Sequence, residues 1–156
     1  MNKTMRAAVI SVMVLLCTAM AQAKPNFSGQ WKLNASLSDF GTMTVPTSLV
    51  QQVTHGEPDL KVVTTMVGEM GEFKVENSYT TDGKECVNKF NNIERRSTLT
   101  WAGDTLVIES KMDMGGNAVT VSEKWSLSED GKTLTIIRHL KGPEGETDIK
   151  TVLEKQ

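Results

Sequence analysis

The sequence predicts an all-β protein, a single antiparallel up-and-down β-barrel of about 8–10 strands. Ten short segments alternate apolar and polar residues with the two-residue period of half-buried strands. Turn signals rich in Gly, Asp and Pro separate most of them. No convincing helical stripe with a 3.6-residue period runs anywhere in 49–156. A meander of this length is expected to close on itself, because closure pairs both edge strands. A β-sandwich is the structural alternative.

The first segment, 27–34, is expected to close one end of the barrel. Its apolar positions alternate with polar ones and are Phe27, Gly29, Trp31 and Leu33. A glycine two residues before a tryptophan predicts a close backbone approach, with the indole plugging the barrel floor.

The remaining strands follow in order along the chain. They are expected at 49–55, 60–67, 73–80, 85–90, 94–102, 105–113, 117–128, 133–141 and 146–154. Residues 35–48 interrupt the pattern and form the longest connection. We expect one helical turn there and a lid over the barrel.

The turn sequences predict which residues face each other across neighbouring strands. Gly103-Asp104, Gly115-Gly116, Asp82-Gly83 and the loop 129–132 are the hairpin turns that fix these pairs. The expected pairs include Trp101 with Leu106, Met112 with Val119, Glu123 with Arg138, Tyr79 with Cys86, and Asn77 with Asn88.

Ten polar residues fall on the inward, otherwise apolar face. They are Gln51, Thr64, Asn77, Asn88, Arg95, Ser97, Ser110, Glu123, Arg138 and Thr151. A buried polar group without a partner costs about 1–3 kcal/mol. The interior is therefore expected to be hydrated, to hold a polar ligand group, or to pair these residues with one another. Both the ligand alternative and the purely structural one stay open.

The predicted ligand site has an apolar wall and a polar belt. The wall consists of Trp101, Trp125, Met112, Ile108 and Ile136. Glu123 and Arg138 would orient a polar head group. Arg95, placed at the other end of the cavity, and the amides Asn77 and Asn88 complete the belt. A small hydrophobic or amphipathic ligand suits such a pocket.

Residues 1–23 are predicted to be a signal peptide. Lys3 and Arg6 precede the apolar run 7–20, and Ala21-Gln22-Ala23 has the pattern of a cleavage site. Leu16 before Cys17 argues against a lipoprotein signal. The mature protein would be one domain, 24–156, in the periplasm or secreted. Its only cysteine would be Cys86, so no internal disulfide is possible, and a structural thiol is expected.

Several function classes are disfavoured. The net charge is −2 and no basic cluster extends beyond Arg95-Arg96, so nucleic acid is not expected as a partner. No apolar stretch after residue 23 could span a membrane as a helix, so no stable membrane insertion is expected.

His55 and His139 lie on different strands without a third ligand, so neither metal nor cofactor is expected. With no catalytic triad or phosphate loop, we expect a monomeric binding protein and not an enzyme.

The pair Gly29-x-Trp31 resembles the first-strand signature of the calycin superfamily, which includes lipocalins, fatty-acid-binding proteins and avidins. Phe27–Leu33 is most similar to the opening strand of the fatty-acid-binding proteins. Residues 130–134 with Arg138 resemble their late strands, and 153–156 resembles their C-terminus. The resemblance implies a barrel that carries ligands inside.

Two departures qualify that resemblance. The connection 35–48 is too short for the family's helix-turn-helix lid. Thr151 and Leu153 stand where an Arg-x-Tyr carboxylate clamp is expected. Arg138 or Arg95 would have to replace the clamp if a carboxylate is bound.

The alternative function is a protein-interaction module, such as a periplasmic enzyme inhibitor that uses its loops. Residues 35–48 and the turns at Met70 and Met114 would then form the contact surface. The chain is also rich in methionine, at Met43, Met66, Met70, Met112 and Met114, which suits either an adaptable pocket rim or simple core filling.

Overall fold

A computed structural model describes residues 23–156, so the predicted signal peptide lies outside the described residues except for Ala23. The strands are β1 Gly29–Leu33, β2 Ser48–Gly56, β3 Asp59–Gly68, β4 Gly71–Thr80, β5 Glu85–Phe90, β6 Ile93–Ala102, β7 Thr105–Asp113, β8 Ala118–Leu127, β9 Thr133–Gly142 and β10 Gly145–Lys155. One short 3-10 helix, η1, spans Ala35–Leu37. In this part of the chain no helix has the length and apolar character needed to cross a bilayer.

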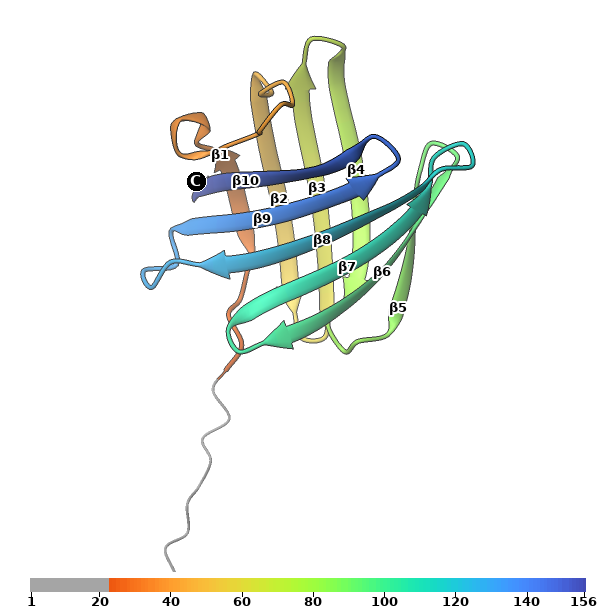
Figure 1. The fold of residues 1–156 in the computed structure, drawn as a ribbon. Coiled ribbons are helices and arrows are strands. Elements are labelled where there is room, and N and C mark those ends of the chain that lie inside the picture. Colours follow the sequence, from red (N-terminus) through yellow and green to blue (C-terminus); the bar gives the residue numbers. More distant parts are fainter. Residues whose placement is uncertain (1–22) are drawn as a thin grey trace, which may run out of the picture.

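The strands form one antiparallel sheet that curls into a nearly closed barrel. Its order is β4-β3-β2-β1-β10-β9-β8-β7-β6-β5, so each strand except β4 and β5 pairs with its chain neighbours, and β1 also pairs with β10. Figure 1 shows the early strands standing behind the later ones, with the interior between them. The predicted up-and-down barrel is therefore confirmed, although its backbone hydrogen bonding stays open between β4 and β5.

Three of the four predicted hairpin registers are confirmed. Trp101 pairs with Leu106, Met112 with Val119, and Glu123 with Arg138. Because side chains alternate between faces, these registers align the apolar residues of β6 to β9 on the inner face.

The register predicted across Asp82-Gly83 is wrong, because β4 and β5 form no ladder. The turn bonds to other parts of the barrel instead. The Thr81 N–H donates to the Pro58 carbonyl at 2.8 Å, and the Gly83 N–H donates to the Leu99 carbonyl at 2.9 Å. These bonds hold the Asp82-Gly83 turn against the β2–β3 turn and against β6. As a result, β4 and β5 diverge from each other on leaving this turn and do not pair.

Side chains replace the missing ladder between β4 and β5. Asn88 accepts from the Ser78 N–H at 2.8 Å and donates to the Ser78 carbonyl at 3.0 Å. Two residues after Ser78 on β4, the Thr80 N–H donates to Cys86 Sγ at 3.1 Å. The asparagine amide thus makes the two bonds that an opposing peptide group would make, and Cys86 has a structural role.

The closed end is built as predicted. Phe27 and Trp31 are fully buried, and Trp31 Nε1 donates to the Phe27 carbonyl at 2.9 Å. Gly29 has φ +145°, and a Cβ there would lie 2.8 Å from Lys155 Cε. The glycine therefore permits both the backbone conformation and the close approach of the last strand.

The connection between β1 and β2 contains the predicted helical turn, but its first half does not act as a lid. Asp39 and Lys150 exchange two backbone hydrogen bonds of 2.7 Å, and Asn34 donates to the Val152 carbonyl at 2.9 Å. This half therefore extends the barrel wall along β10 and covers Val152, which is buried.

Candidate ligand-binding site

A buried carboxylate with two arginines stands at the centre of the interior. Glu123 on β8 is 3% exposed. Its Oε1 lies 2.7 Å from Arg95 Nη2, and its Oε2 lies 3.3 Å from Arg138 Nη2. Trp125 Nε1 donates to Oε2 at 3.1 Å. The predicted Glu123–Arg138 pair is confirmed.

The expected position of Arg95 at the other end of the cavity is wrong. Arg95 lies on β6, two strands from Glu123 on β8, and both residues sit on the inner face. The barrel's curvature and the length of the arginine side chain bring its guanidinium onto the same carboxylate. One glutamate therefore holds two arginines.

The arginines keep this carboxylate ionised. Burial would raise the pKa of Glu123, but the positive charges of Arg138 and Arg95 outweigh it and hold the pKa at about 2. Two guanidinium groups against one carboxylate leave one excess positive charge, carried by side chains that are partly exposed, 22% at Arg95 and 33% at Arg138. Arg95 Nε is also buried, with no hydrogen-bond partner among the residues described.

Two further polar side chains point into the same interior. Burial raises the pKa of the Tyr79 phenol to about 12, so the phenol is neutral. Gln51 is 6% exposed, and its Nε2 donates to Thr64 Oγ1 at 3.3 Å. Gln51 Oε1 is buried and finds no partner within 23–156. A polar group from a ligand or a water would satisfy it.

An apolar pocket opens beside β4 and β5 and reaches Arg95. It measures about 290 Å³ and is lined by Val75, Asn77, Asn88, Lys89, Phe90, Ile93, Arg95, Met112 and Met114. Four predicted site residues meet here, namely Asn77, Asn88, Arg95 and Met112. The missing ladder between β4 and β5 is what leaves this wall thin.

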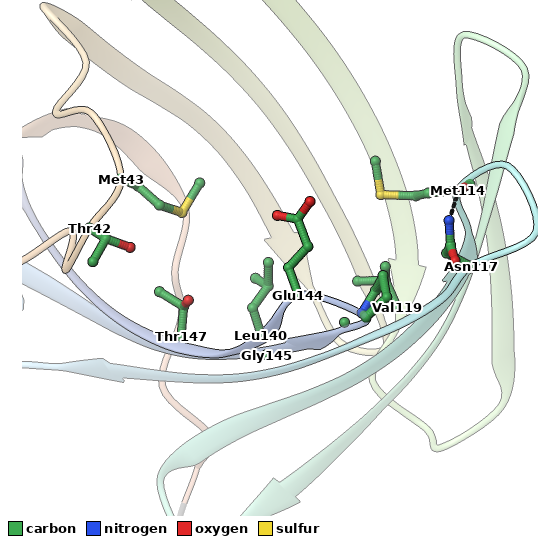
Figure 2. A pocket seen from close by; sticks show the side chains of 11 residues that line it. Thr42, Met43, Met114, Asn117, Val119, Leu140, Glu144, Gly145 and Thr147 are labelled. Carbon is green, nitrogen blue, oxygen red and sulfur yellow. Dashed lines mark hydrogen bonds between the residues drawn. The ribbon is translucent and has the colours of Figure 1, made fainter.

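A second pocket of about 530 Å³ lies at the open end of the barrel, the end formed by 34–47 and by the turns that follow β3, β5, β7 and β9. Its lining residues are Thr42, Met43, Met114, Asn117, Val119, Leu140, Gly142, Pro143, Glu144, Gly145 and Thr147. Figure 2 shows Met43 and Met114 on opposite sides of it, with the Glu144 side chain rising between them.

The other predicted wall residues lie deeper. Ile108, Ile136 and Trp125 are buried in the hydrophobic core. Trp101 stands at the closed end, stacked on Phe27 with ring centroids 5.9 Å apart, and its Nε1 donates to Glu57 at 3.1 Å. The structure thus separates Trp101, in the floor, from the polar centre at Glu123.

Sequence reasoning missed a polar cluster in that floor, in which His55 and Thr81 are buried and Glu57 is exposed. His55 Nδ1 accepts from the Phe27 N–H at 3.2 Å, and its Nε2 lies 3.0 Å from Glu57. Glu57 also accepts from Thr81 Oγ1. Burial raises the pKa of Glu57, but the hydrogen bonds from Thr81 and His55 outweigh it and leave the pKa below its ordinary value. Alternation along this strand places His55 on the inward face together with Leu49, Gln51 and Val53. The inward position of His55 could therefore have been predicted from the sequence.

The two histidines are far from forming a metal site. His139 faces outward, where Nδ1 lies 2.7 Å from Asp148 and Nε2 lies 3.4 Å from Glu146. In the described part of the chain, no three His, Cys, Asp or Glu side chains are placed to hold a metal ion.

The meander order defines a ten-stranded antiparallel up-and-down β-barrel, the fold that the sequence predicts. No protein-family model matches the chain, and no curated protein matches it either. Solved structures do match.

The zebrafish ileal bile acid-binding protein, complexed with cholic acid, has a TM-score of 0.58 at 15% identity, covering 83% of this chain and 98% of that chain. Secretory abundant heat soluble protein 4 from Ramazzottius varieornatus has a TM-score of 0.58 at 15% identity, and the match covers 87% of this chain and 99% of that chain. Another secretory abundant heat soluble protein from this species has a TM-score of 0.57 at 11% identity, and the match covers 85% of this chain and 98% of that chain. At these identities the similarity is one of fold.

Proposed function

We propose that the barrel holds a small hydrophobic or amphipathic molecule, with an anionic head group against Arg95 and Arg138. The observation that carries this proposal is the excess positive charge around Glu123. A buried charge is costly unless it is paired. An anionic head would neutralise the second guanidinium and could accept a hydrogen bond from Arg95 Nε.

The pocket beside β4 and β5 would take the apolar part of the ligand. Val75, Phe90, Ile93 and Met112 supply apolar surface next to Arg95. A volume of about 290 Å³ holds roughly ten water-sized groups. That matches a medium-length alkyl chain or part of a ring system. The cholic acid bound by the zebrafish neighbour is consistent with such a ligand.

The proposed location of the protein is the periplasm or the medium, after cleavage behind Ala23, as a monomer. The signal-like residues 1–23 support it. N-terminal sequencing of exported protein would give Lys24 as the first residue. An uncleaved or cytoplasmic product would contradict this.

The proposal includes no catalytic role for Glu123. A general base works best with a pKa near the operating pH. Glu123 is held ionised with a pKa of about 2, so it is a poor proton acceptor at neutral pH.

Competition with a fluorescent anionic probe tests the ligand class. We expect decanoate to displace the probe, and decanol and decyltrimethylammonium to bind more weakly by about tenfold or more. Arg138→Gln should remove the preference for decanoate over decanol. Arg96→Gln is the matched control, because Arg96 is the adjacent outward arginine, paired with Glu85 and Glu94.

Two results would contradict the proposal. One is equal affinity for decanoate and decanol in the unmodified protein. The other is an absence of any displacement, together with no co-purifying molecule in native mass spectrometry.

A further inference from the structure

Exposed apolar side chains gather at the open end of the barrel. The large exposed hydrophobic residues there, which we call the methionine rim, are Met43, Val45, Met66, Met70, Phe90 and Met114. Met70 is 88% exposed. Elsewhere on residues 23–156 the large exposed hydrophobics, Leu37, Val87 and Ile137, lie on separate elements. Clustered exposed apolar surface marks an interaction site more often than scattered residues do.

Two residues of the rim, Met43 and Met114, line the larger of the two pockets described above. Met43 from the β1–β2 connection and Met114 from the β7–β8 turn face it from two sides, over a base of Val119 and Leu140 (Figure 2). A pocket of about 530 Å³ has room for one or two large apolar side chains of a partner. Methionine side chains are unbranched and polarisable, so they adapt to differently shaped partners.

The same end carries carboxylates that no basic side chain neutralises. Glu69, Glu72 and Glu144 have no ion-pair partner among the described side chains. Two lysines near this end are already engaged, Lys89 with Glu94 at 3.9 Å and Lys141 with Glu146 at 2.8 Å. Lys74 on β4 and Lys111 on β7 also lie near this end, but they are fewer than its carboxylates, which include Glu69, Glu72, Glu94, Glu144 and Glu146. The rim is therefore apolar and acidic at once, whereas the barrel centre carries excess positive charge.

From this combination we propose that the open end docks a basic amphipathic helical peptide segment, on a surface that shares Phe90 and Met114 with the apolar pocket beside β4 and β5. The rim residues come from the β1–β2 connection, the β3–β4 hairpin, β5 and the β7–β8 turn. A small molecule could cover only part of that span, whereas a helix about 10 Å wide can lie across it. One apolar residue of the helix would enter the pocket beside Met43 and Met114. Its Lys or Arg residues would meet Glu69, Glu72 and Glu144, as in helix-in-groove recognition.

Calorimetric titration of residues 24–156 with designed peptides tests this docking. The probe is a Leu/Lys amphipathic helix of about five turns. Its counterparts are a Leu/Glu helix of the same pattern and a Leu/Lys peptide scrambled to remove the apolar face. We expect only the first to bind, and to weaken as salt increases. The double variant Met43→Gln/Met114→Gln should lose about tenfold or more in affinity. Glu144→Gln should reduce the salt dependence.

Two control variants separate the rim from other surfaces. Ile137→Gln changes an exposed apolar residue on the outer wall and should leave peptide affinity unchanged. Arg138→Gln should also leave it unchanged, although it alters interior binding. The docking proposal is overturned if the Leu/Lys helix fails to bind, if the Leu/Glu helix binds equally well, or if Ile137→Gln weakens binding as much as the methionine variant.

Discussion

At the scale of single residues, Glu123 is the side chain on which the interior depends. It accepts from Trp125 and pairs with both Arg95 and Arg138 while almost completely buried. Removing one partner from a buried ion network leaves uncompensated charge, which is more harmful than never having had the network. Ligand binding and folding stability are therefore both expected to respond to this residue.

Glu123→Gln should lower the free energy of unfolding at neutral pH by about 3–5 kcal/mol. The folded pKa is about 2, below the ordinary 4.5. The stabilisation from ionised Glu123 is therefore present above pH 4.5 and is lost as the pH falls towards 2. Urea unfolding across this window should show the gap between the two proteins closing. Glu76→Gln, on an exposed pair with Lys61, should change little. A gap that persists at pH 2 would contradict the assignment.

Tyr79 offers a direct optical test, because it is the only tyrosine in the chain. Burial raises its pKa to about 12. The tyrosinate absorbance of the folded protein should therefore rise near pH 12, and that of the urea-unfolded protein near the ordinary value of 10. Coincident titrations in the two states would show that the phenol is exposed. Because the raised pKa favours the neutral phenol, its contribution to stability is lost as the pH rises from 10 towards 12.

At the scale of elements, the space between β4 and β5 is the feature that distinguishes this barrel from a closed ring. Asn88 spans it with two hydrogen bonds to the backbone of Ser78, and the adjacent pocket reaches Arg95. This gap is where we expect the proposed ligand to reach the charged residues around Glu123.

Asn88→Leu should cost about 1–3 kcal/mol, because it leaves the Ser78 N–H and carbonyl without their partners. Amide hydrogen exchange should accelerate at Ser78 and little elsewhere. Asn77→Leu is the matched control, since the Asn77 side chain has no hydrogen-bond partner in residues 23–156. Equal effects of the two variants would indicate that Asn88 does not bridge the strands.

Gly29 fixes how β1 enters the closed end. Gly29→Ala should destabilise the fold by about 1–3 kcal/mol, because φ +145° strains any residue with a Cβ. The new Cβ would also displace Lys155. Gly56→Ala provides the comparison, as its Cβ would meet nothing within 4 Å. Urea midpoints of both variants check this, and a neutral Gly29→Ala would show that the strand can relax.

At the scale of the whole molecule, the barrel has two unlike ends. The closed end is sealed by the chain's own residues 24–28, where Lys24 Nζ donates to the Gly103 carbonyl at 2.9 Å and stands 5.5 Å from the centre of the Trp101 ring. Phe27 packs beneath, with its ring centre 5.6 Å from that of His55 and 5.9 Å from that of Trp101. The open end is apolar and acidic. Ligand entry and partner docking are thus expected away from the floor.

Phe27→Ala should destabilise the whole barrel by about 3–5 kcal/mol, because it removes a fully buried aromatic side chain and leaves a cavity. Leu37→Ala, at a residue that is 55% exposed, should have little effect. Thermal unfolding followed by tryptophan fluorescence compares the two. If Phe27→Ala left the transition unchanged, the N-terminal segment would not be part of the cooperative fold.

The sequence by itself determined the strands, the meander order, the inward face and the Glu123–Arg138 pair. These follow from the two-residue alternation and from turns that act over a few residues, so local chemistry specifies them. The Asp82-Gly83 register failed because that turn bonds to Pro58 and Leu99, which lie far away in the chain.

Some features depend on how the sheet curves into a barrel, and only the tertiary structure decided these. It brought Arg95 onto Glu123 from two strands away, opened the wall between β4 and β5, and gathered the methionine rim at one end. It also turned His55 into part of the floor, bonded to the backbone of Phe27. The alternation of apolar and polar residues along a strand predicts which face of the sheet each side chain lies on. Which side chains meet across that face is set by how the sheet closes, and no local pattern carries that information.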